Sequence, residues 1–509
     1  MAIETLRGER VLIVGVGLSG ASAARFLRRR GVAFDLVDDR GVPPELAALL
    51  DGDADAQGVG AEAIRGTVHE RFDAALATRF DVLVLSPGVP RAHPAVQAAL
   101  ANGARVIGDV ELFAGAVADE VSLVAVTGSN GKSTVVVWLA EVLRRVGADA
   151  AACGNVGRAV LDELDGSAGG MVVDGEAPVA RTPEEGRSSP CLVLELSSYQ
   201  LESTFSLAPH VATVLNVSAD HLDRYASFEE YAAVKRRVHE RASRLLVNAD
   251  DPATAPSVSD GTIDAAAVAR FTLAVLDTDD DAAPAAARFP ETLWHRASRD
   301  GELWLCRDGE PLLPQSELGV PGEHNVANAL AVLALIDALA ERLPALGPDP
   351  AASGAVREAL CAFRGLPHRT ELVAEQHGVR WYNDSKGTNV DACAKAVAAM
   401  PGPVVLIAGG LAKGADFTPL RPLLAARAKA AILIGRDRER LHEALDGATE
   451  LHRADSLEAA VARAAALGVA SDAVLLSPAC ASFDMFADFE DRGRQFRRCV
   501  HELLGREVA

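Results

Sequence analysis

The stretch Val124–Thr134, VAVTGSNGKST, decides how this sequence folds. It lies between a β-branched strand pattern at residues 122–126 and an apolar helical pattern at residues 135–147. Backbone N–H groups in such a strand-to-helix loop bind anions, and a neighbouring lysine neutralises the anion's charge. Val126 stands where the common phosphate-binding motif has its first glycine. We predict a nucleotide triphosphate site, with the serine after the lysine as a ligand of Mg²⁺, formed by Gly128, Ser129, Asn130, Gly131, Lys132, Ser133 and Thr134.

The composition is that of a globular chain with a large core. The 509 residues are 49% hydrophobic and 24% charged, with a formal charge of -21. Such an acidic surface repels nucleic acids and anionic membranes, so we expect small-molecule partners, no nucleic acid and no membrane insertion. The seven cysteines form no C-x-x-C pair, and the sequence has neither a signal peptide pattern nor an apolar run of about 20 residues. We therefore predict a cytoplasmic protein, and we expect a monomer.

The length and the order of the sequence patterns predict three domains. At roughly 150 residues per domain the chain is long enough for three, and strand patterns alternate with helical ones throughout, which predicts mainly parallel sheets. We predict an α/β protein with a Rossmann-like N-terminal domain at residues 1–108, a central P-loop ATPase domain at residues 109–364 and a Rossmann-like C-terminal domain at residues 365–509. Two segments rich in Gly, Pro or Asp, at residues 166–190 and 277–287, are predicted to be exposed loops.

A glycine motif follows the first strand pattern. Gly15, Gly17 and Gly20 form G-x-G-x-x-G, and Asp38 comes about 20 residues later. By itself this spacing predicts a dinucleotide site, but it also fits a tight turn that binds no nicotinamide. An oxidoreductase would rest on this motif alone and would leave the loop at Gly128 unexplained.

Acidic and polar residues follow the strands of the central region. Glu195 ends a buried strand pattern, where a lone carboxylate is costly without a cation, so we interpret it as a metal ligand in preference to a helix-capping acid. His221 follows the next strand pattern, and either a metal-binding or a structural role fits it. Later clusters around Asn325, Arg369 and Asp384 also fit ordinary turns and helix caps.

Taken together, the motifs resemble those of the Mur ligases. The resemblance covers residues 11–494, and it is closest to the members that add glutamate to UDP-N-acetylmuramoyl-L-alanine. It rests on VTGSNGKST, LELSSYQLE, NVSADHLDRY, GEHNVANAL, GLPHRTE, NDSKGTN, GGLAKGADF and LLSPACASFDMFADFEDRG, in this order. The last of these segments argues against the related folate-polyglutamate enzymes.

The resemblance implies an ATP-dependent amide ligase of peptidoglycan precursor synthesis, which activates a carboxylate as an acyl phosphate before D-glutamate attacks. It implies two Mg²⁺ ions, held by Ser133, Glu195, His221 and Lys235, and catalytic roles for Lys132, His221 and Lys235. Lys235 matches a lysine that is carbamylated in relatives, although its helical position alone indicates a solvated side chain. The implied contacts to ATP add Asn325, Asn328, Arg369, Asp384 and Lys386 to the phosphate loop.

The implied substrate contacts fall into two groups. Those to the uridine diphosphate substrate are Leu18, Ser19, Asp38, Arg40, Gly88 and Asn155; those to glutamate are Thr388, Lys413, Ser482 and Phe489. The family pattern therefore replaces the nicotinamide cofactor with a uridine diphosphate at the N-terminal glycine motif. A scaffold protein that binds a nucleotide remains an alternative for the phosphate loop, but it needs no pocket around Lys413 and Ser482. The sequence does not distinguish D-glutamate from L-glutamate.

Overall fold

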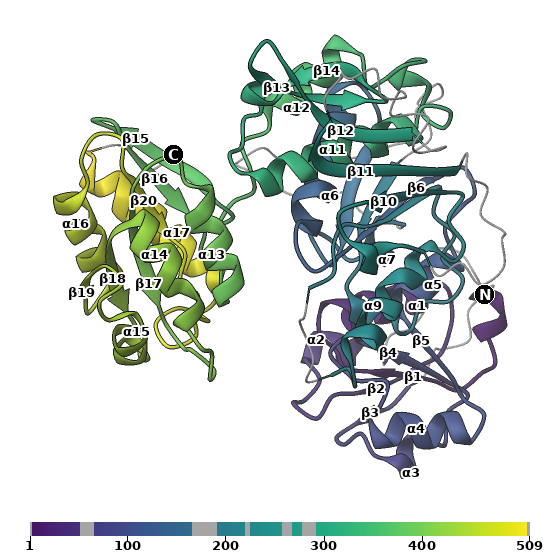
Figure 1. The fold of residues 1–509 in the computed structure, drawn as a ribbon. Helices are drawn as coiled ribbons and strands as arrows, with labels where there is room; N and C mark the ends of the chain where they lie inside the picture. The colour runs from purple at the N-terminus through teal and green to yellow at the C-terminus, as the bar shows by residue number, and fades with distance from the viewer. Residues whose placement is uncertain are drawn as a thin grey trace. The chain divides into compact units, whose positions relative to one another are not determined.

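The computed structural model describes residues 3–50, 66–164, 191–218, 224–256, 267–276 and 292–505 (Figure 1). The predicted exposed loops at residues 166–190 and 277–287 lie outside these ranges. The chain divides into two compact units. Unit 1 comprises Met1–Ser316 and Ala327–Leu360, and unit 2 comprises Glu317–Val326 and Cys361–Ala509. The predicted domain boundaries at residues 108 and 364 stay predictions.

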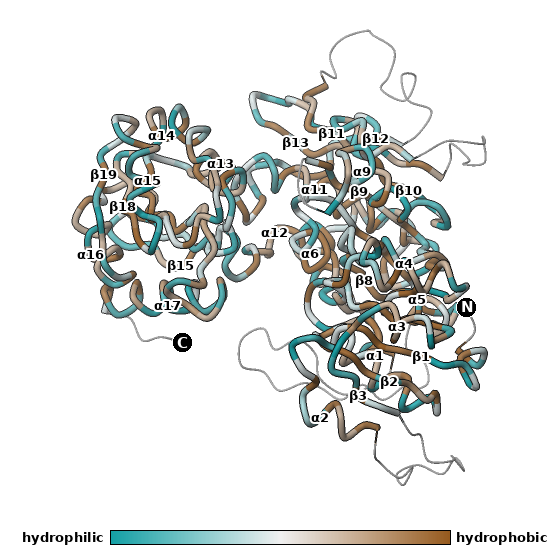
Figure 2. The backbone as a smooth tube through the Cα atoms, turned by 90° about the horizontal axis from the view of Figure 1, so that it is seen from below, coloured by the Kyte–Doolittle hydropathy of each residue, from teal (hydrophilic) through white to brown (hydrophobic). Residues whose placement is uncertain are grey.

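The N-terminal part of unit 1 is a parallel five-stranded sheet in the order β3-β2-β1-β4-β5. Alternate residues of β1 face two separate cores: Ile13 packs with α1 and α5, and Leu12 packs with α3 and α4. Figure 2 shows the hydrophobic segments gathered around α1 and β1. The elements are β1 (Val11–Val14), α1 (Leu18–Arg29), β2 (Asp35–Val37), α2 (Pro44–Ala47), β3 (Val68–His69), α3 (Ala74–Ala77), β4 (Val82–Leu85), α4 (Pro94–Ala101), β5 (Arg105–Gly108) and α5 (Asp109–Ala114).

This strand order places a ligand site between β1 and β4. The chain leaves β1 in one direction to reach β2 and β3, and it returns to the other side of β1 for β4 and β5. Loops that follow neighbouring strands diverge at such a point and leave a crevice at the carboxyl ends of the strands. The glycine motif after β1 therefore lies beside the segment Ser86–Pro90 after β4.

Unit 1 also contains a nine-stranded sheet in the order β14-β13-β12-β11-β10-β9-β6-β8-β7. Its interior strand β6 lies between the parallel strands β9 and β8 and is buried along its whole length, as expected of a strand covered on both faces. The elements are β6 (Ser122–Thr127), α6 (Lys132–Arg145), β7 (Ala150–Gly154), α7 (Val160–Glu163), β8 (Cys191–Glu195), α8 (Ser198–Leu201), β9 (Val211–Val214), α9 (Phe228–Arg236), β10 (Arg244–Asn248), β11 (Val268–Val275), β12 (Thr292–Arg299), β13 (Glu302–Arg307), β14 (Glu310–Pro314), α11 (Glu323–Ala338) and α12 (Gly354–Ala362).

The far edge of this sheet departs from the parallel pattern. Strands β12, β13 and β14 pair antiparallel through two tight turns, at Asp300-Gly301 and Asp308-Gly309. All four turn residues have positive φ, which two-residue hairpin turns require and which Asp-Gly supplies. This edge was not predicted from the sequence, although the two Asp-Gly pairs are a hairpin signal.

Unit 2 is built on a six-stranded sheet in the order β15-β16-β20-β17-β18-β19, in which only β15 is antiparallel to its neighbour. Helices α13, α14 and α15 cover one face, and α16 and α17 cover the other (Figure 1). The elements are β15 (Glu371–Gln376), β16 (Val379–Asn383), α13 (Val390–Ala399), β17 (Val404–Gly409), α14 (Arg421–Arg427), β18 (Ala428–Ile434), α15 (Arg438–Leu445), β19 (Glu450–Arg453), α16 (Leu457–Leu467), β20 (Ala473–Leu476) and α17 (Phe489–Leu503).

Three mainly parallel α/β sheets confirm the predicted fold class. The seven cysteines are unpaired, and all but Cys361 are buried, in agreement with their interpretation as small apolar core residues. Within the described ranges, no helix is both long enough and apolar enough to cross a membrane.

Candidate active site

The phosphate loop connects the buried strand β6 to helix α6. Gly131 directly precedes the helix with a φ of 83°, a conformation that L side chains rarely adopt. A Cβ at this position would also lie 2.6 Å from the Oδ1 atom of Asn328, a residue of α11. Glycine is therefore required at position 131. The first turn of α6, which begins at Lys132, carries backbone N–H groups that have no acceptor in a preceding turn, as an anion site needs.

Two lysines share one acceptor in this loop. The Nζ atom of Lys132 donates to the carbonyl oxygens of Gly128 at 2.8 Å and Ser129 at 2.9 Å. The Nζ atom of Lys235, on α9, donates to the same Gly128 oxygen at 2.8 Å and lies 4.7 Å from the ring centroid of Tyr231. Lys235 is only 2% exposed, so its interpretation as a solvated helix residue was wrong. The family pattern assigns Lys235 to a metal site through a carbamate, and that role stays a prediction; the structure places its Nζ atom against the phosphate loop.

Glu195 ends β8, which is adjacent to β6, and is buried at 2% exposure. Its Oε1 atom accepts a hydrogen bond of 2.8 Å from the Asn155 side chain, whereas its Oε2 atom has no hydrogen-bond partner among the described residues. A buried carboxylate oxygen without a partner is costly, and a divalent cation is the usual remedy. Glu195 therefore fits a Mg²⁺ ligand.

The described residues hold no group of three or more His, Cys, Asp or Glu side chains arranged for a metal. His221, the other predicted protein ligand of this kind, lies outside the described residues. A site with one or two protein oxygens is what Mg²⁺ uses when phosphates and water complete its coordination.

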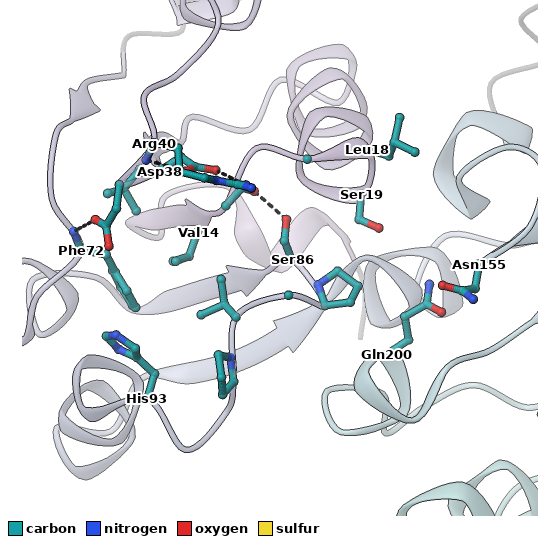
Figure 3. Close-up of a pocket in the computed structure, with 18 of the residues that line it drawn as sticks. Val14, Leu18, Ser19, Asp38, Arg40, Phe72, Ser86, His93, Asn155 and Gln200 are labelled. Atoms are coloured by element: carbon teal, nitrogen blue, oxygen red, sulfur yellow. Dashed lines mark hydrogen bonds and ion pairs between the residues drawn. The ribbon is translucent and has the colours of Figure 1, made fainter. Parts of the chain in front are cut away.

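A pocket of about 630 Å³ opens at the crevice between β1 and β4 (Figure 3). All six residues predicted to contact the uridine diphosphate substrate line it, from both sheets of unit 1: Leu18, Ser19, Asp38, Arg40, Gly88 and Asn155. Figure 3 shows Asp38, Arg40, Phe72 and His93 at one end of the pocket and Ser19, Asn155 and Gln200 at the other. These two groups of residues therefore line opposite ends of one pocket.

Asp38, at one end of the pocket, is held in place by backbone hydrogen bonds. Asp38 accepts hydrogen bonds from the backbone N–H groups of Val16, at 3.0 Å, and Arg40, at 2.9 Å. The Arg40 side chain also donates to this carboxylate, and these bonds lower the pKa of Asp38 to about 2. Asp38 is therefore ionised at neutral pH. Gly20 packs so closely on the Gly15 carbonyl that any Cβ would overlap it, which explains the third glycine of the motif without a cofactor.

Several residues of this pocket were not predicted from the sequence. Phe72 stacks on His93 with ring centroids 5.1 Å apart, and Ser86 donates to the Gly15 carbonyl at 2.6 Å. Gln200 lies in the quoted motif LSSYQLE but was not singled out. Gln200 is far along the chain from the N-terminal glycine motif, so the sequence did not indicate that both line one pocket.

In unit 2, polar residues gather at the carboxyl ends of neighbouring strands. Asp384, which follows β16, accepts hydrogen bonds from Ser477 Oγ at 2.7 Å and the Thr370 backbone at 3.2 Å. Burial raises the pKa of Asp384 to about 7 despite these bonds and the nearby charge of Arg369. Lys386 lies 3.9 Å from the ring centroid of Phe489, the first residue of α17. Three predicted ATP or glutamate contacts thus occupy one region of the unit.

The remaining predicted glutamate contacts lie in loops of the same region. Thr388, Lys413 and Ser482 follow β16, β17 and β20, which are adjacent in the sheet. Leu411 and Ala481 pair as a β-bridge, which brings the loops of Lys413 and Ser482 together, and Lys413 adopts a left-handed φ of 47°. The structure therefore brings the loops of Lys413 and Ser482 together, and the glutamate contacts stay a prediction.

A buried arginine that the sequence analysis did not single out supports this region. Arg492, on α17, is fully buried and donates to Ser385 Oγ at 2.9 Å, to the Ser385 carbonyl at 2.8 Å and to the Cys480 carbonyl at 3.2 Å. It therefore connects the loop after β16 with the loop after β20. The predicted ATP contacts divide between the units: Lys132 and Asn328 belong to unit 1, and Asn325, Arg369, Asp384 and Lys386 to unit 2.

The fold and these sites define an enzyme of the α/β class with a phosphate loop, a carboxylate suited to a metal and an extended pocket. Family models for Mur ligases match three consecutive parts of the chain: a MurD-like N-terminal domain at residues 9–108, the Mur ligase middle domain at residues 126–336 and the glutamate ligase domain at residues 368–480. The chain belongs to the Mur ligase family and is a ligase.

Two relatives agree with this assignment, and a solved structure has a similar fold. The chain is 42% identical to the UDP-N-acetylmuramoylalanine--D-glutamate ligase of Nitrosococcus oceani, over 97% of this chain and 96% of that one. It is 41% identical to the enzyme of the same name from Methylobacillus flagellatus, over 99% of both chains. Its fold is similar to UDP-N-acetylmuramate-alanine ligase MurC from Thermotoga maritima, with a TM-score of 0.54, 17% identity and coverage of 97% of this chain and 100% of that one.

Proposed function

We propose that this protein uses ATP to join D-glutamate to UDP-N-acetylmuramoyl-L-alanine, a cytoplasmic step of peptidoglycan precursor synthesis. The reaction forms an acyl phosphate on the alanyl carboxylate, and the amine of glutamate then displaces phosphate. The products are the amide, ADP and phosphate. The two relatives named above carry this activity in their names.

The observation that carries the proposal is the position of Asn155. Its side chain lines the pocket on the N-terminal glycine motif and also donates to Glu195, beside the phosphate loop. A substrate whose diphosphate lies at the N-terminus of α1 therefore extends toward the site where a phosphoryl group is transferred. Phosphoryl transfer depends on such positioning and on charge neutralisation more than on a protein nucleophile.

ATP would bind with its phosphates at the first turn of α6. Lys132, whose ammonium group now contacts Gly128 and Ser129, is the cation closest along the chain to that turn. Mg²⁺ would neutralise charge on the transferring phosphoryl group when bound. Ser133 and Glu195 would hold one ion, and His221 and a carbamate on Lys235 the second. The burial of Lys235 against Gly128 supports a function at the phosphates.

Glutamate would bind in unit 2. Lys413 supplies a cation and Thr388 and Ser482 supply hydroxyls, which suits an amino acid with two carboxylates. Asn325, Arg369, Asp384 and Lys386 would contact the nucleotide from the same unit. The fully buried Arg492 keeps the loops that carry Lys386 and Ser482 in place.

The test is phosphate release from ATP and Mg²⁺ with UDP-N-acetylmuramoyl-L-alanine, in parallel reactions with D-glutamate, L-glutamate or neither. We expect release that requires both the nucleotide substrate and D-glutamate. Release that depends on L-glutamate would reassign the stereochemistry of the amino acid. Phosphate release that needs neither glutamate nor UDP-N-acetylmuramoyl-L-alanine would contradict a ligase and favour a nucleotide-dependent scaffold.

A further inference from the structure

The backbone of the phosphate loop is held by the segment that follows β9. The N–H group of Ser129 donates to the Asn216 carbonyl at 2.8 Å. The N–H group of Asn130 donates to Asn216 Oδ1 at 2.8 Å, and Asn216 Nδ2 donates back to the Asn130 carbonyl at 3.0 Å. The side-chain amide of Asn216 thus pairs with Asn130 as a neighbouring strand would.

A second set of contacts extends the same attachment. The hydroxyl of Ser129 accepts from the Ser218 backbone N–H group at 3.0 Å and lies 3.2 Å from the hydroxyl of Tyr231. Tyr231 is on α9, the helix that carries Lys235. The loop is therefore connected to both the segment after β9 and the helix of the second predicted phosphate-site lysine.

These bonds determine which N–H groups face an anion. An N–H group that already donates to a protein acceptor is not available to a phosphate oxygen, because each has one proton. The N–H groups of Ser129 and Asn130 are used within the protein. Phosphate contacts of the backbone must then come from the following segment, at the first turn of α6.

We propose that Asn216 is a positioning residue for ATP: its amide side chain fixes the phosphate loop so that the first turn of α6 faces the phosphates. The inference rests on the proposed function, because it takes the bound anion to be ATP. On this proposal, Ser129 and Asn130 determine the shape of the loop, and the backbone N–H groups that contact phosphate belong to residues 131–134.

Asn248 provides a matched control. It ends β10, the strand next to β9, and like Asn216 it is partly buried and uses its side chain in two hydrogen bonds. Its Nδ2 atom donates to the Leu215 carbonyl at 2.8 Å, and its Oδ1 atom accepts from the Asp250 N–H group at 2.9 Å. Its side chain thus stabilises the same region without a contact to Ser129 or Asn130.

The experiment compares N216A with N248A in the full chain. The loss of two hydrogen bonds that preorganise the loop should raise the KM for ATP and the Kd for Mg²⁺-ATP about tenfold in N216A. The KM values for the UDP substrate and glutamate should stay within about twofold of the wild type, since neither binds this loop. In N248A all three KM values should stay near those of the wild type, while Tm should fall by about as much as it does in N216A.

Amide hydrogen exchange supplies a readout that needs no substrate. The amide of Asn130 should exchange faster in N216A than in the wild type or N248A, because its acceptor is gone. If N216A and N248A raised the KM for ATP equally, Asn216 would contribute only to general stability and the proposal would be overturned. An unchanged exchange rate of the Asn130 amide in N216A would also overturn it. If the wild type fails to release phosphate but the exchange difference appears, the proposed reaction is wrong and the loop attachment stands.

Discussion

The carboxylate of Glu195 is buried with one oxygen satisfied and the other without a partner in the described protein. Among the described residues, the Asn155 side chain donates to it, through Oε1. A neutral glutamine keeps the acceptor for Asn155 and removes the cost of the buried charge. It also removes the anionic ligand that we assign to Mg²⁺. When Glu195 is replaced by glutamine, the metal-free protein should therefore keep or gain thermal stability, whereas the Mg²⁺-dependent activity should fall.

We predict that E195Q lowers ligase activity by about a hundredfold or more while the metal-free protein unfolds at the same temperature as the wild type or higher. Phosphate release and thermal unfolding, each with and without Mg²⁺ and ATP, measure the two effects. E141Q is the control: Glu141 is on α6 and pairs with Arg145 on the surface side of that helix. An active E195Q, or one that unfolds well below the wild type without metal, would refute the metal assignment.

The residues that sequence reasoning predicted differ in kind from those it missed. Lys132 and Glu195 were predicted because a glycine-bearing loop and the end of a buried strand are visible in a short window. Asn216 and Arg492 were missed because their partners, Asn130 and Ser385, are 86 and 107 residues away along the chain. Lys235 was misjudged from its helix alone, since burial depends on what packs against that helix.

At the scale of elements, the short helix α8 and the residue that follows it link the two sheets of unit 1. Glu202 accepts from Arg224 Nε at 2.9 Å and Nη2 at 2.8 Å, and the guanidinium stacks 3.9 Å from the ring centroid of Tyr199. The same arginine donates through Nη1 to the Pro87 carbonyl at 2.9 Å, in the loop that carries Gly88. Arg224 thus fixes one wall of the N-terminal pocket from the central sheet.

We predict that R224K raises the KM for UDP-N-acetylmuramoyl-L-alanine about tenfold with little change in kcat or in the KM for ATP. A lysine keeps the charge but cannot pair with both Glu202 oxygens and reach Pro87, because it lacks the planar fork of donors. Steady-state kinetics with each substrate varied in turn measure the effect. R10K is the control, since Arg10 makes a similar paired contact with Asp81 away from the pocket. Equal losses for all substrates would contradict a local effect.

The order of elements was predictable to different degrees. The alternation of strands and helices gave the three α/β regions, because apolar runs end at glycine or polar residues each time. The hairpins β12–β13 and β13–β14 were missed, although Asp300-Gly301 and Asp308-Gly309 mark them. The strand order within each sheet could not be predicted, since β6 pairs with β8 and β9 rather than with the next strand along the chain.

At the scale of the whole molecule, the predicted ATP contacts belong to two compact units. The helix α11 itself is divided, with Asn325 in unit 2 and Asn328 in unit 1. Unit 1 holds two sheets and unit 2 holds one, and each unit has its own hydrophobic core. The predicted boundary at residue 364 places Asn325 and Asn328 in one domain, because it follows the sequence motifs and takes no account of how α11 packs. The roles of these residues in binding ATP stay predictions.

A ligand that needs contacts from both units favours states in which they close around it, by its differential affinity for those states. We therefore predict that Mg²⁺-ATP analogues lower the radius of gyration measured by X-ray scattering in solution. K132A is the control: it removes the phosphate contact that we propose in unit 1 and should show no compaction at the same nucleotide concentration. An unchanged radius at saturating nucleotide in the wild type would mean that ATP binds without closure, and the contacts assigned to Arg369, Asp384 and Lys386 would then have to be withdrawn.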